Sequence, residues 1–333
     1  MATIGASLYT LADWVAQFGP ETEKAVPIVE ILMETNAILL DMLWQEGNLA
    51  NGHKHTIRTG LPTPTWRLLN YGVIPTKGTT APVIDTTGNL EAYSQVDKDI
   101  ADMGGKTREV RAGQDAAHIE GMNQTVADCI FYGNQATDPK TFTGLAPRYN
   151  SLSAESGENI IDAGGSGSDN TSIWLVTWGE RATFGIFPMG KKGGLQVDDQ
   201  GEDRVIDSAG GYYQAYITHF KWECGLSVAD WRYNVRIANI DVSLMADAGE
   251  SGYTGAALEL LMIDAVHKLP STEVGTVVWY CNREVATALH KLATTKTNAF
   301  LKYDEFGGKK VLTMNGFPVR RCDALLNTET RVT

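Results

Sequence analysis

The chain has 333 residues, which at roughly 150 residues per domain predicts about two domains or one large irregular one. With 43% hydrophobic and 20% charged residues, it has enough apolar content to build a core. Its 28 basic and 40 acidic residues give a net charge of −12, which argues against a protein that grips nucleic acid through many phosphate contacts. No membrane span is expected, because acidic and amide side chains such as Glu30, Glu34 and Asn36 interrupt the best apolar run.

The four cysteines are scattered: Cys129, Cys224, Cys281 and Cys322. Because no CxxC pair exists, the sequence predicts neither a zinc site of the usual spacing nor a disulfide framework. Isolated thiols of this kind fit a reducing cytosol.

The first third of the chain has three parts that differ in their apolar pattern. Apolar residues recur at helical spacing over 26–46, which predicts a helix, after a looser arm. From 52 to about 105, prolines, glycines and threonines replace that period. We interpret 52–105 as a long two-stranded excursion with little core of its own, so that Trp66, Leu68, Leu69 and Tyr71 need cover from elsewhere.

Regular elements follow. A helical face that includes Ala116, Ile119, Met122 and Val126 predicts a helix over 112–132, and a polar loop spans 150–170. Aromatic and β-branched runs predict strands at 173–178, 183–187, 212–220 and 232–240, with an acidic turn at 198–203. The remainder reads as α/β, with helices at 255–269 and 283–293 and strands at 276–280, 311–314 and 318–321.

Candidate chemistry is weak throughout. His53 and His55 would share one face of a strand, but no third metal ligand is evident. The glycine-rich 164–168 lacks the residues of a phosphate-binding loop. The acidic residues of 198–203 could bind calcium by residue type but lack the spacing of a calcium loop; they are Asp198, Asp199, Glu202 and Asp203. The sequence therefore predicts no catalytic residue, no metal and no cofactor.

The order of elements, together with six segments, resembles the major capsid proteins of double-stranded DNA tailed phages, and most closely those of short-tailed phages. The segments are ETNAILLDMLWQEGN (34–48), GLPTPTWRLLNYGVIPTKGTT (60–80), EGMNQTVADCIFYGN (120–134), GLAPRYNSL (144–152), NTSIWLVTWGE (170–180) and DWRYNVRIANID (230–241). Together they cover much of the chain.

The resemblance implies an α+β Hong Kong 97-like fold in four parts. These are an N-terminal arm (1–46), an extended loop (47–105), a peripheral domain with spine helix 112–132 (106–245), and an axial domain (246–333). The family's peripheral strands usually follow the axial domain, whereas the β-rich segment 171–243 precedes it here. Either the strand order is rearranged or the boundaries differ.

The resemblance also implies a function. The chain would be a structural major capsid protein that assembles as hexamers and pentamers into an icosahedral shell, enclosing DNA without reading its sequence. It would be made in the bacterial host cytoplasm and reside in the virion. Implied partners are a separate scaffolding protein, a portal, and a cement or decoration protein. The predicted subunit-contact residues lie in the extended loop: Arg58, Trp66, Arg67 and Tyr71.

Two other function classes stay open on the residues alone. One is a hydrolase that uses the acidic turn and the histidines. The other is a monomeric β-rich binding module that uses exposed tryptophan. Particles or capsomers would favour the shell protein, and a well-behaved monomer would favour the other two.

Overall fold

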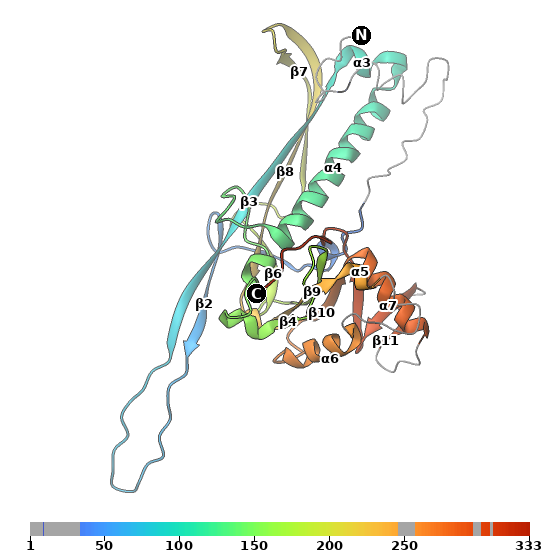
Figure 1. The fold of residues 1–333 in the computed structure, drawn as a ribbon. Helices are drawn as coiled ribbons and strands as arrows, with labels where there is room; N and C mark the ends of the chain where they lie inside the picture. The colour runs from blue at the N-terminus through green and yellow to red at the C-terminus, as the bar shows by residue number, and fades with distance from the viewer. Residues whose placement is uncertain (1–8, 10–33, 246–256, 296–300, 307–308) are drawn as a thin grey trace. The chain divides into compact units, whose positions relative to one another are not determined.

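The computed structural model describes Tyr9 and residues 34–245, 257–295, 301–306 and 309–333 (Figure 1). The chain divides into two compact units, each assembled from separate segments. The first unit comprises Met1–Glu34, Asn89–Ala127 and Gly194–Glu223, and the second comprises Thr35–Gly88, Asp128–Gly193 and Cys224–Thr333. Three elements supply residues to both units: β3 (Thr79–Asp97), α4 (Thr107–Tyr132) and β8 (Tyr212–Val228).

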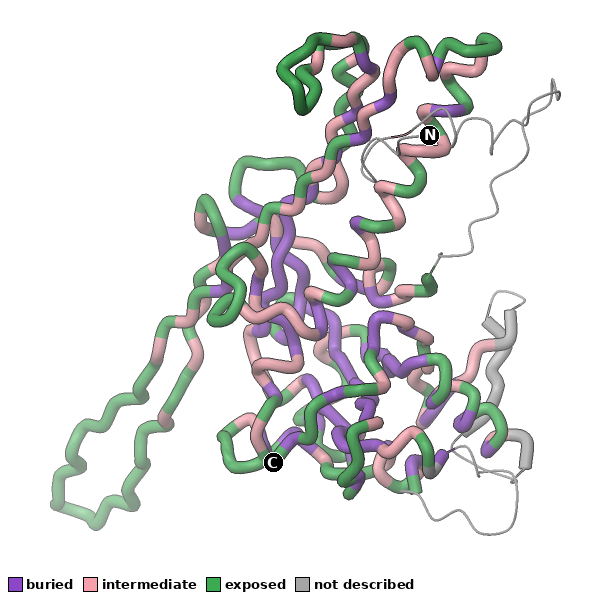
Figure 2. The backbone as a smooth tube through the Cα atoms, turned by 45° about the horizontal axis from the view of Figure 1, so that its top comes forward, coloured by how far each residue is buried: buried purple, intermediate pink, exposed green. Residues whose placement is uncertain are grey.

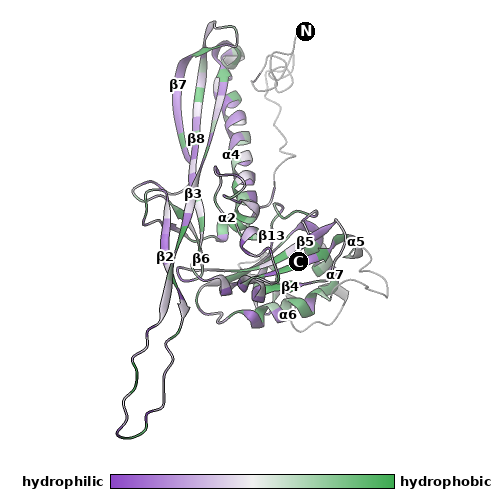
Figure 3. Cartoon of the chain, turned by 60° about the vertical axis from the view of Figure 1, so that its left-hand side comes forward, coloured by the Kyte–Doolittle hydropathy of each residue, from purple (hydrophilic) through white to green (hydrophobic). Residues whose placement is uncertain are grey.

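The second unit is built on a mixed sheet. Its strand order runs β11-β12-β13-β10-β5-β6-β8-β3-β2, with β1 on β6 and with β9 between β4 and β5. The strands not yet given are β1 (Trp44–Glu46), β2 (Gly52–Gly60), β4 (Ile160–Asp162), β5 (Asn170–Trp178), β6 (Thr183–Phe187), β9 (Asn234–Asp241), β10 (Thr276–Cys281), β11 (Leu301–Phe306), β12 (Lys309–Met314) and β13 (Phe317–Arg321). All nine residues of β5 are buried, as expected for a central strand that is covered on both faces. Figure 3 shows the hydropathy of the strands and helices, with hydrophobic residues in green.

Two helices complete the main core of the second unit, α6 (Leu258–Lys268) and α7 (Arg283–Thr295). Helix α7 buries Val285, Ala288, Leu289 and Leu292, the i, i+3, i+4, i+7 pattern of an amphipathic helix. These side chains share one core with residues of β5, β9 and β10. The side chain of Asn282 caps α7, because its Oδ1 accepts a hydrogen bond of 2.8 Å from the Val285 N–H.

The first unit contains the antiparallel hairpin of β7 (Gln196–Ile206) and β8, together with the greater part of α4 and the end of β3. Val96, Ala101 and Val110 form a small core with Tyr216 packed against it. Polar pairs add to it, since Lys98 donates to Glu202 and Arg111 pairs with Asp199. Both pairs are partly exposed, so they add little to the stability that the packed core gives this unit.

The remaining elements are short. They are α2 (Ile38–Asp41), α3 (Lys98–Ala101), α5 (Val242–Met245) and the 3-10 turns at Met103–Gly105, Ala146–Arg148, Glu155–Asn159 and Trp231–Tyr233. Among the described residues, no helix is long and apolar enough to cross a membrane.

The predicted helix over 26–46 is wrong where the structure describes it. Residues 26–33 lie outside the described residues, α2 has only four residues, and the backbone turns extended at Met42. Trp44–Glu46 then pairs in parallel with Gly185–Phe187. Sheet pairing therefore outweighs the local helical period, which is a weak prior beside tertiary contacts.

Two further expectations need correction. The acidic residues 198–203 do not form a turn, because they lie within strand β7, where Asp198 pairs with His219 and Asp203 with Ala215. The spine helix begins at Thr107, five residues before the predicted start, and Ala116 on its predicted apolar face is exposed. Met122 and Val126 on the same face are buried, as expected.

The compact units also differ from the predicted domains, which are continuous segments. Strand β5 pairs with β10, and residues on both sides of position 245 share one core. The strands within 171–243 divide, since β7 lies in the first unit and β5 and β9 lie in the second. As parts of a capsid fold, the segments 1–46, 47–105, 106–245 and 246–333 stay a prediction.

Met122→Asp should abolish soluble folded protein. Met122 is 4% exposed, and an unpaired carboxylate there would cost several kcal/mol, about the whole margin of a typical domain. Circular dichroism and the soluble yield measure the loss. Ala116→Asp, on an exposed position of the same helix, is the matched control. A soluble, folded Met122→Asp protein would contradict the helix register.

Candidate intersubunit contact site

The strongest candidate site is the loop hairpin, which we define as residues 52–86. Strands β2 and β3 pair antiparallel from Gly52 opposite Thr86 to Gly60 opposite Thr79, with an irregularity between Arg58 and Gly60. Residues 61–78, which we call the loop tip, contain no helix or strand. The hairpin is therefore a two-stranded stem with an eighteen-residue tip.

A buried carboxylate holds the base of this stem. Asp85 on β3 is 4% exposed. Its Oδ1 accepts a hydrogen bond of 2.7 Å from Arg148 Nη2, and its Oδ2 accepts one of 2.8 Å from Ser227 Oγ. The Val228 N–H also donates to Oδ2 at 3.3 Å. A charged acceptor with three donors is well satisfied despite burial, so these contacts fix the position where the stem leaves the unit.

Close backbone approach tightens the same base. A Cβ atom on Gly52 would lie 2.3 Å from the Asp85 carbonyl oxygen, and one on Gly225 would lie 2.7 Å from that of Thr86. Only glycine fits at such separations. Asn48 adds a paired contact with the Lys54 backbone, since its Oδ1 accepts from the Lys54 N–H and its Nδ2 donates to the Lys54 carbonyl, both at 2.7 Å.

Two histidines line the inner face of the stem. His53 and His55 are stacked with ring centroids 6.2 Å apart, and His53 also packs edge-on against Phe184. The predicted sharing of one strand face is confirmed by this stacking. Among the described residues, no group of three or more His, Cys, Asp or Glu side chains is arranged to hold a metal ion.

Burial sets the ionisation of His55. Its side chain is 12% exposed, and neither ring nitrogen has a hydrogen-bond partner. Burial disfavours the imidazolium and holds the pKa of His55 below its ordinary value of 6.5, against the opposing effect of Asp85 3.7 Å away. His53 and Arg148 lower the pKa further.

The loop tip is exposed along its whole length (Figure 2). It carries seven large apolar side chains that contact solvent: Leu61, Trp66, Leu68, Leu69, Tyr71, Val73 and Ile74. Trp66 is fully exposed, and Leu61 and Ile74 are 79% and 83% exposed. Such a run is unusual for a monomer, in which exposed apolar residues are scattered and large contiguous patches mark interaction sites.

The structure gathers three of the four predicted contact residues. Trp66, Arg67 and Tyr71 lie in the loop tip, whereas Arg58 lies on β2 beside the irregular pairing. All four side chains are exposed. Sequence reasoning missed the anchor made by Asp85 and Arg148. The sequence feature that could have pointed to this anchor is the position of Asp85 at the end of a long segment without acidic residues.

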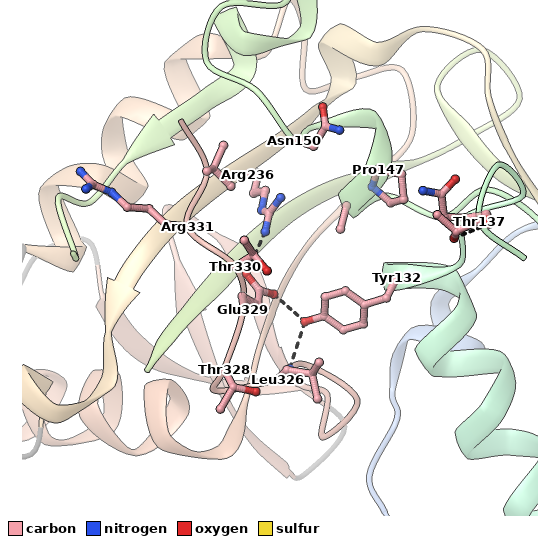
Figure 4. Close-up of a pocket in the computed structure, with 13 residues that line it drawn as sticks. Tyr132, Thr137, Pro147, Asn150, Arg236, Leu326, Thr328, Glu329, Thr330 and Arg331 are labelled. Carbon is pink, nitrogen blue, oxygen red and sulfur yellow. Dashed lines mark hydrogen bonds and ion pairs between the residues drawn. The ribbon is translucent and has the colours of Figure 1, made fainter. Parts of the chain in front are cut away.

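A concavity in the second unit lies along the last residues of the chain (Figure 4). This cavity of about 450 Å³ is lined by Tyr132, Arg236 and Glu329 among others. The Arg236–Glu329 ion pair is buried at 2.8 Å, and Tyr132 Oη donates to Glu329 Oε1 at 2.5 Å. Burial raises the pKa of Tyr132. These polar groups are one another's hydrogen-bond and ion-pair partners. We therefore interpret them as contacts that hold the C-terminal segment in place.

Taken together, the geometry defines a class of protein. A hairpin that is firmly anchored at its base and apolar at its tip is typical of a subunit whose packing is completed by other chains.

Comparison with known proteins gives the family. The family model described as "Major capsid protein GP7" matches residues 20–333, so the chain belongs to this family of major capsid proteins. The chain is similar to a chain in a structure of bacteriophage Epsilon15, with 40% identity, complete coverage of both chains and a TM-score of 0.79. It is thus a structural capsid protein with the Hong Kong 97-like α+β fold.

More distant likenesses add no argument. The capsid of bacteriophage JBD30 matches at 6% identity and a TM-score of 0.49, covering 90% of this chain and 95% of that one. An encapsulin from Synechococcus elongatus PCC 7942 matches at 12% identity and 0.44, covering 69% and 96%. No curated protein matches the chain.

Acidification should loosen the base of the stem. Because the pKa of His55 is lower in the folded chain than in the unfolded one, unfolding takes up a proton, and stability falls as pH drops through about 6.5. One such group gives a slope of at most about 1.4 kcal/mol per pH unit. Urea unfolding of the unassembled chain at pH 7.5 and 5.5 measures it.

His55→Phe keeps the ring and removes the titration, so it should flatten that slope. His267→Gln, on an exposed position of α6, should leave the slope unchanged. An unchanged slope in His55→Phe would show that other groups cause the pH dependence.

Proposed function

We propose that this chain assembles as hexamers and pentamers into an icosahedral shell that encloses double-stranded DNA, with the loop hairpin lying across a neighbouring subunit. The observation that carries the proposal is the loop tip, whose seven large apolar side chains find no cover within the described chain. Membership of the capsid family supports it.

A neighbour that covers the loop tip would supply a free energy of burial that the isolated chain lacks. Burying one large apolar side chain contributes about 1.5–3 kcal/mol, and the seven of the loop tip lie in water in the isolated chain. Every subunit of the shell would repeat that contribution.

The contact residues follow from their places in the hairpin. We propose that Trp66 and Tyr71 are the aromatic anchors and that Arg58 and Arg67 flank them, because aromatic residues and arginine dominate the binding energy of protein interfaces. Trp66 presents the largest apolar surface of the tip. The segments 47–105, 106–245 and 246–333 would serve as extended loop, peripheral domain and axial domain.

The wider partnership follows from a shell of this kind. We propose a separate scaffolding protein, a portal, and a cement or decoration protein as partners, and synthesis in the bacterial host cytoplasm before assembly into the virion. The net charge of −12 suits a lining that does not grip packaged DNA. No enzymatic step is required of the chain.

Trp66→Ala tests the loop contact. The isolated subunit should remain folded by circular dichroism, because Trp66 touches no core. Assembly should fail, or shells should dissociate at lower denaturant, since truncating an interface anchor costs about 2–4 kcal/mol. Negative-stain images and denaturant titration of particles measure both effects.

Thr65→Ala, which removes a small neighbouring side chain, is the matched control and should assemble normally. A Trp66→Ala chain that misfolds as a monomer would instead place Trp66 in an internal core.

A further inference from the structure

We propose that electrostatic attraction guides the contact of the loop hairpin, because its cations dock onto an acidic surface of a second copy of this chain. This inference rests on the proposed function. Between Glu46 and Asp85 the chain contains no acidic residue, yet it contains Lys54, Arg58, Arg67 and Lys77. The segment 47–84 therefore carries four positive charges in a chain whose net charge is −12.

The charge is strongly segregated. Without 47–84, the other residues of the chain hold 24 basic and 40 acidic side chains, a net charge of −16. Two copies therefore carry net charges of the same sign outside this segment, and charges of opposite sign where the segment of one copy meets the rest of the other. The asymmetry selects the loop as the part of one copy that approaches another.

The four cations are exposed and free for such a contact. Among the described residues, none of their side chains has an ion-pair partner within the chain, whereas at least nine other lysines and arginines do. Lys54 and Arg58 stand four residues apart on β2, so they share one face of the strand, roughly 13 Å apart. That face is exposed, and Ile84 lies opposite Lys54 on β3.

The chemistry of the hairpin favours a protein partner over DNA. Phosphates would satisfy the cations but would leave the aliphatic side chains Leu61, Leu68 and Ile74 in water. A protein surface with an apolar centre and an acidic rim would bury the aliphatic side chains and pair with the cations, as ordinary interfaces do. The occupant is therefore a second copy of the chain, with its net negative charge.

Salt and charge variants of the full-length chain test the proposal. Light scattering gives the association rate of the purified protein in 50 and 500 mM NaCl, where the screening length falls from about 14 to about 4 Å. The wild-type rate should fall about tenfold over this range. Arg58→Glu/Arg67→Glu should associate at least about tenfold more slowly in 50 mM NaCl and lose the salt dependence. Arg58→Gln/Arg67→Gln should fall between the two.

Lys140→Glu is the control for charge, since it reverses an exposed cation outside the hairpin, and it should associate as the wild type does. A wild-type rate that is insensitive to salt, or a charge-reversed chain that associates normally, would overturn the electrostatic docking. Shells seen by electron microscopy with that same variant would leave the proposed function standing.

A gel-shift assay with duplex DNA covers the remaining alternative. No shift by the wild type at 150 mM NaCl supports docking on protein. A shift that the charge-reversed variant loses, with its self-association unchanged, would assign the cations to DNA and overturn the proposal. Failure of the wild-type chain to form shells even with its phage assembly partners would instead refute the proposed function.

Discussion

A single buried carboxylate fixes where the loop hairpin leaves the second unit. Asp85 would be costly to bury alone, but Arg148, Ser227 and the Val228 N–H all donate to it. The arginine and the two strand residues come from different parts of the chain, so the contact ties β3, the segment after α4 and β8 together. The stem is thereby held at its base while its tip remains uncovered.

This arrangement divides stability between two levels. The cores of the two units stabilise the subunit itself, through β5, β9, β10 and the two helices α6 and α7 in the larger of them. The loop tip contributes nothing there, because its apolar side chains contact no core. Its free energy of burial becomes available only on association, which links the folding of one chain to its function in a shell.

Much of this could be predicted from the sequence, and the failures share one physical origin. Helix α7 and the strands β5 and β10 follow from periodicity and apolar runs. The helix expected at 26–46 failed in its described part because Trp44–Glu46 pairs with a strand about 140 residues later. The strand β7 was missed because its acidic residues are typical of a turn, whereas its strand conformation comes from pairing with β8, which follows later in the chain.

Only part of the candidate site could be predicted from the sequence. A proline-punctuated segment with glycines, threonines and aromatic residues and no helical period predicted an excursion, and the contacts of Trp66 and Tyr71 stay a prediction. Asp85 and Arg148 could not be paired from sequence, because they lie 63 residues apart and meet only in the folded chain. Local patterns encode exposure well, whereas long-range polar contacts require the fold.

The most direct measurement is the accessibility of the loop tip before and after assembly. Leu68→Cys places a thiol at an exposed position of the tip, while the native cysteines give little background, since Cys224, Cys281 and Cys322 are buried and burial raises the pKa of Cys129. Maleimide should label the new thiol rapidly in unassembled subunits and at least about tenfold more slowly in shells. Equal labelling rates in the two states would contradict the claim that a neighbouring subunit covers the loop tip.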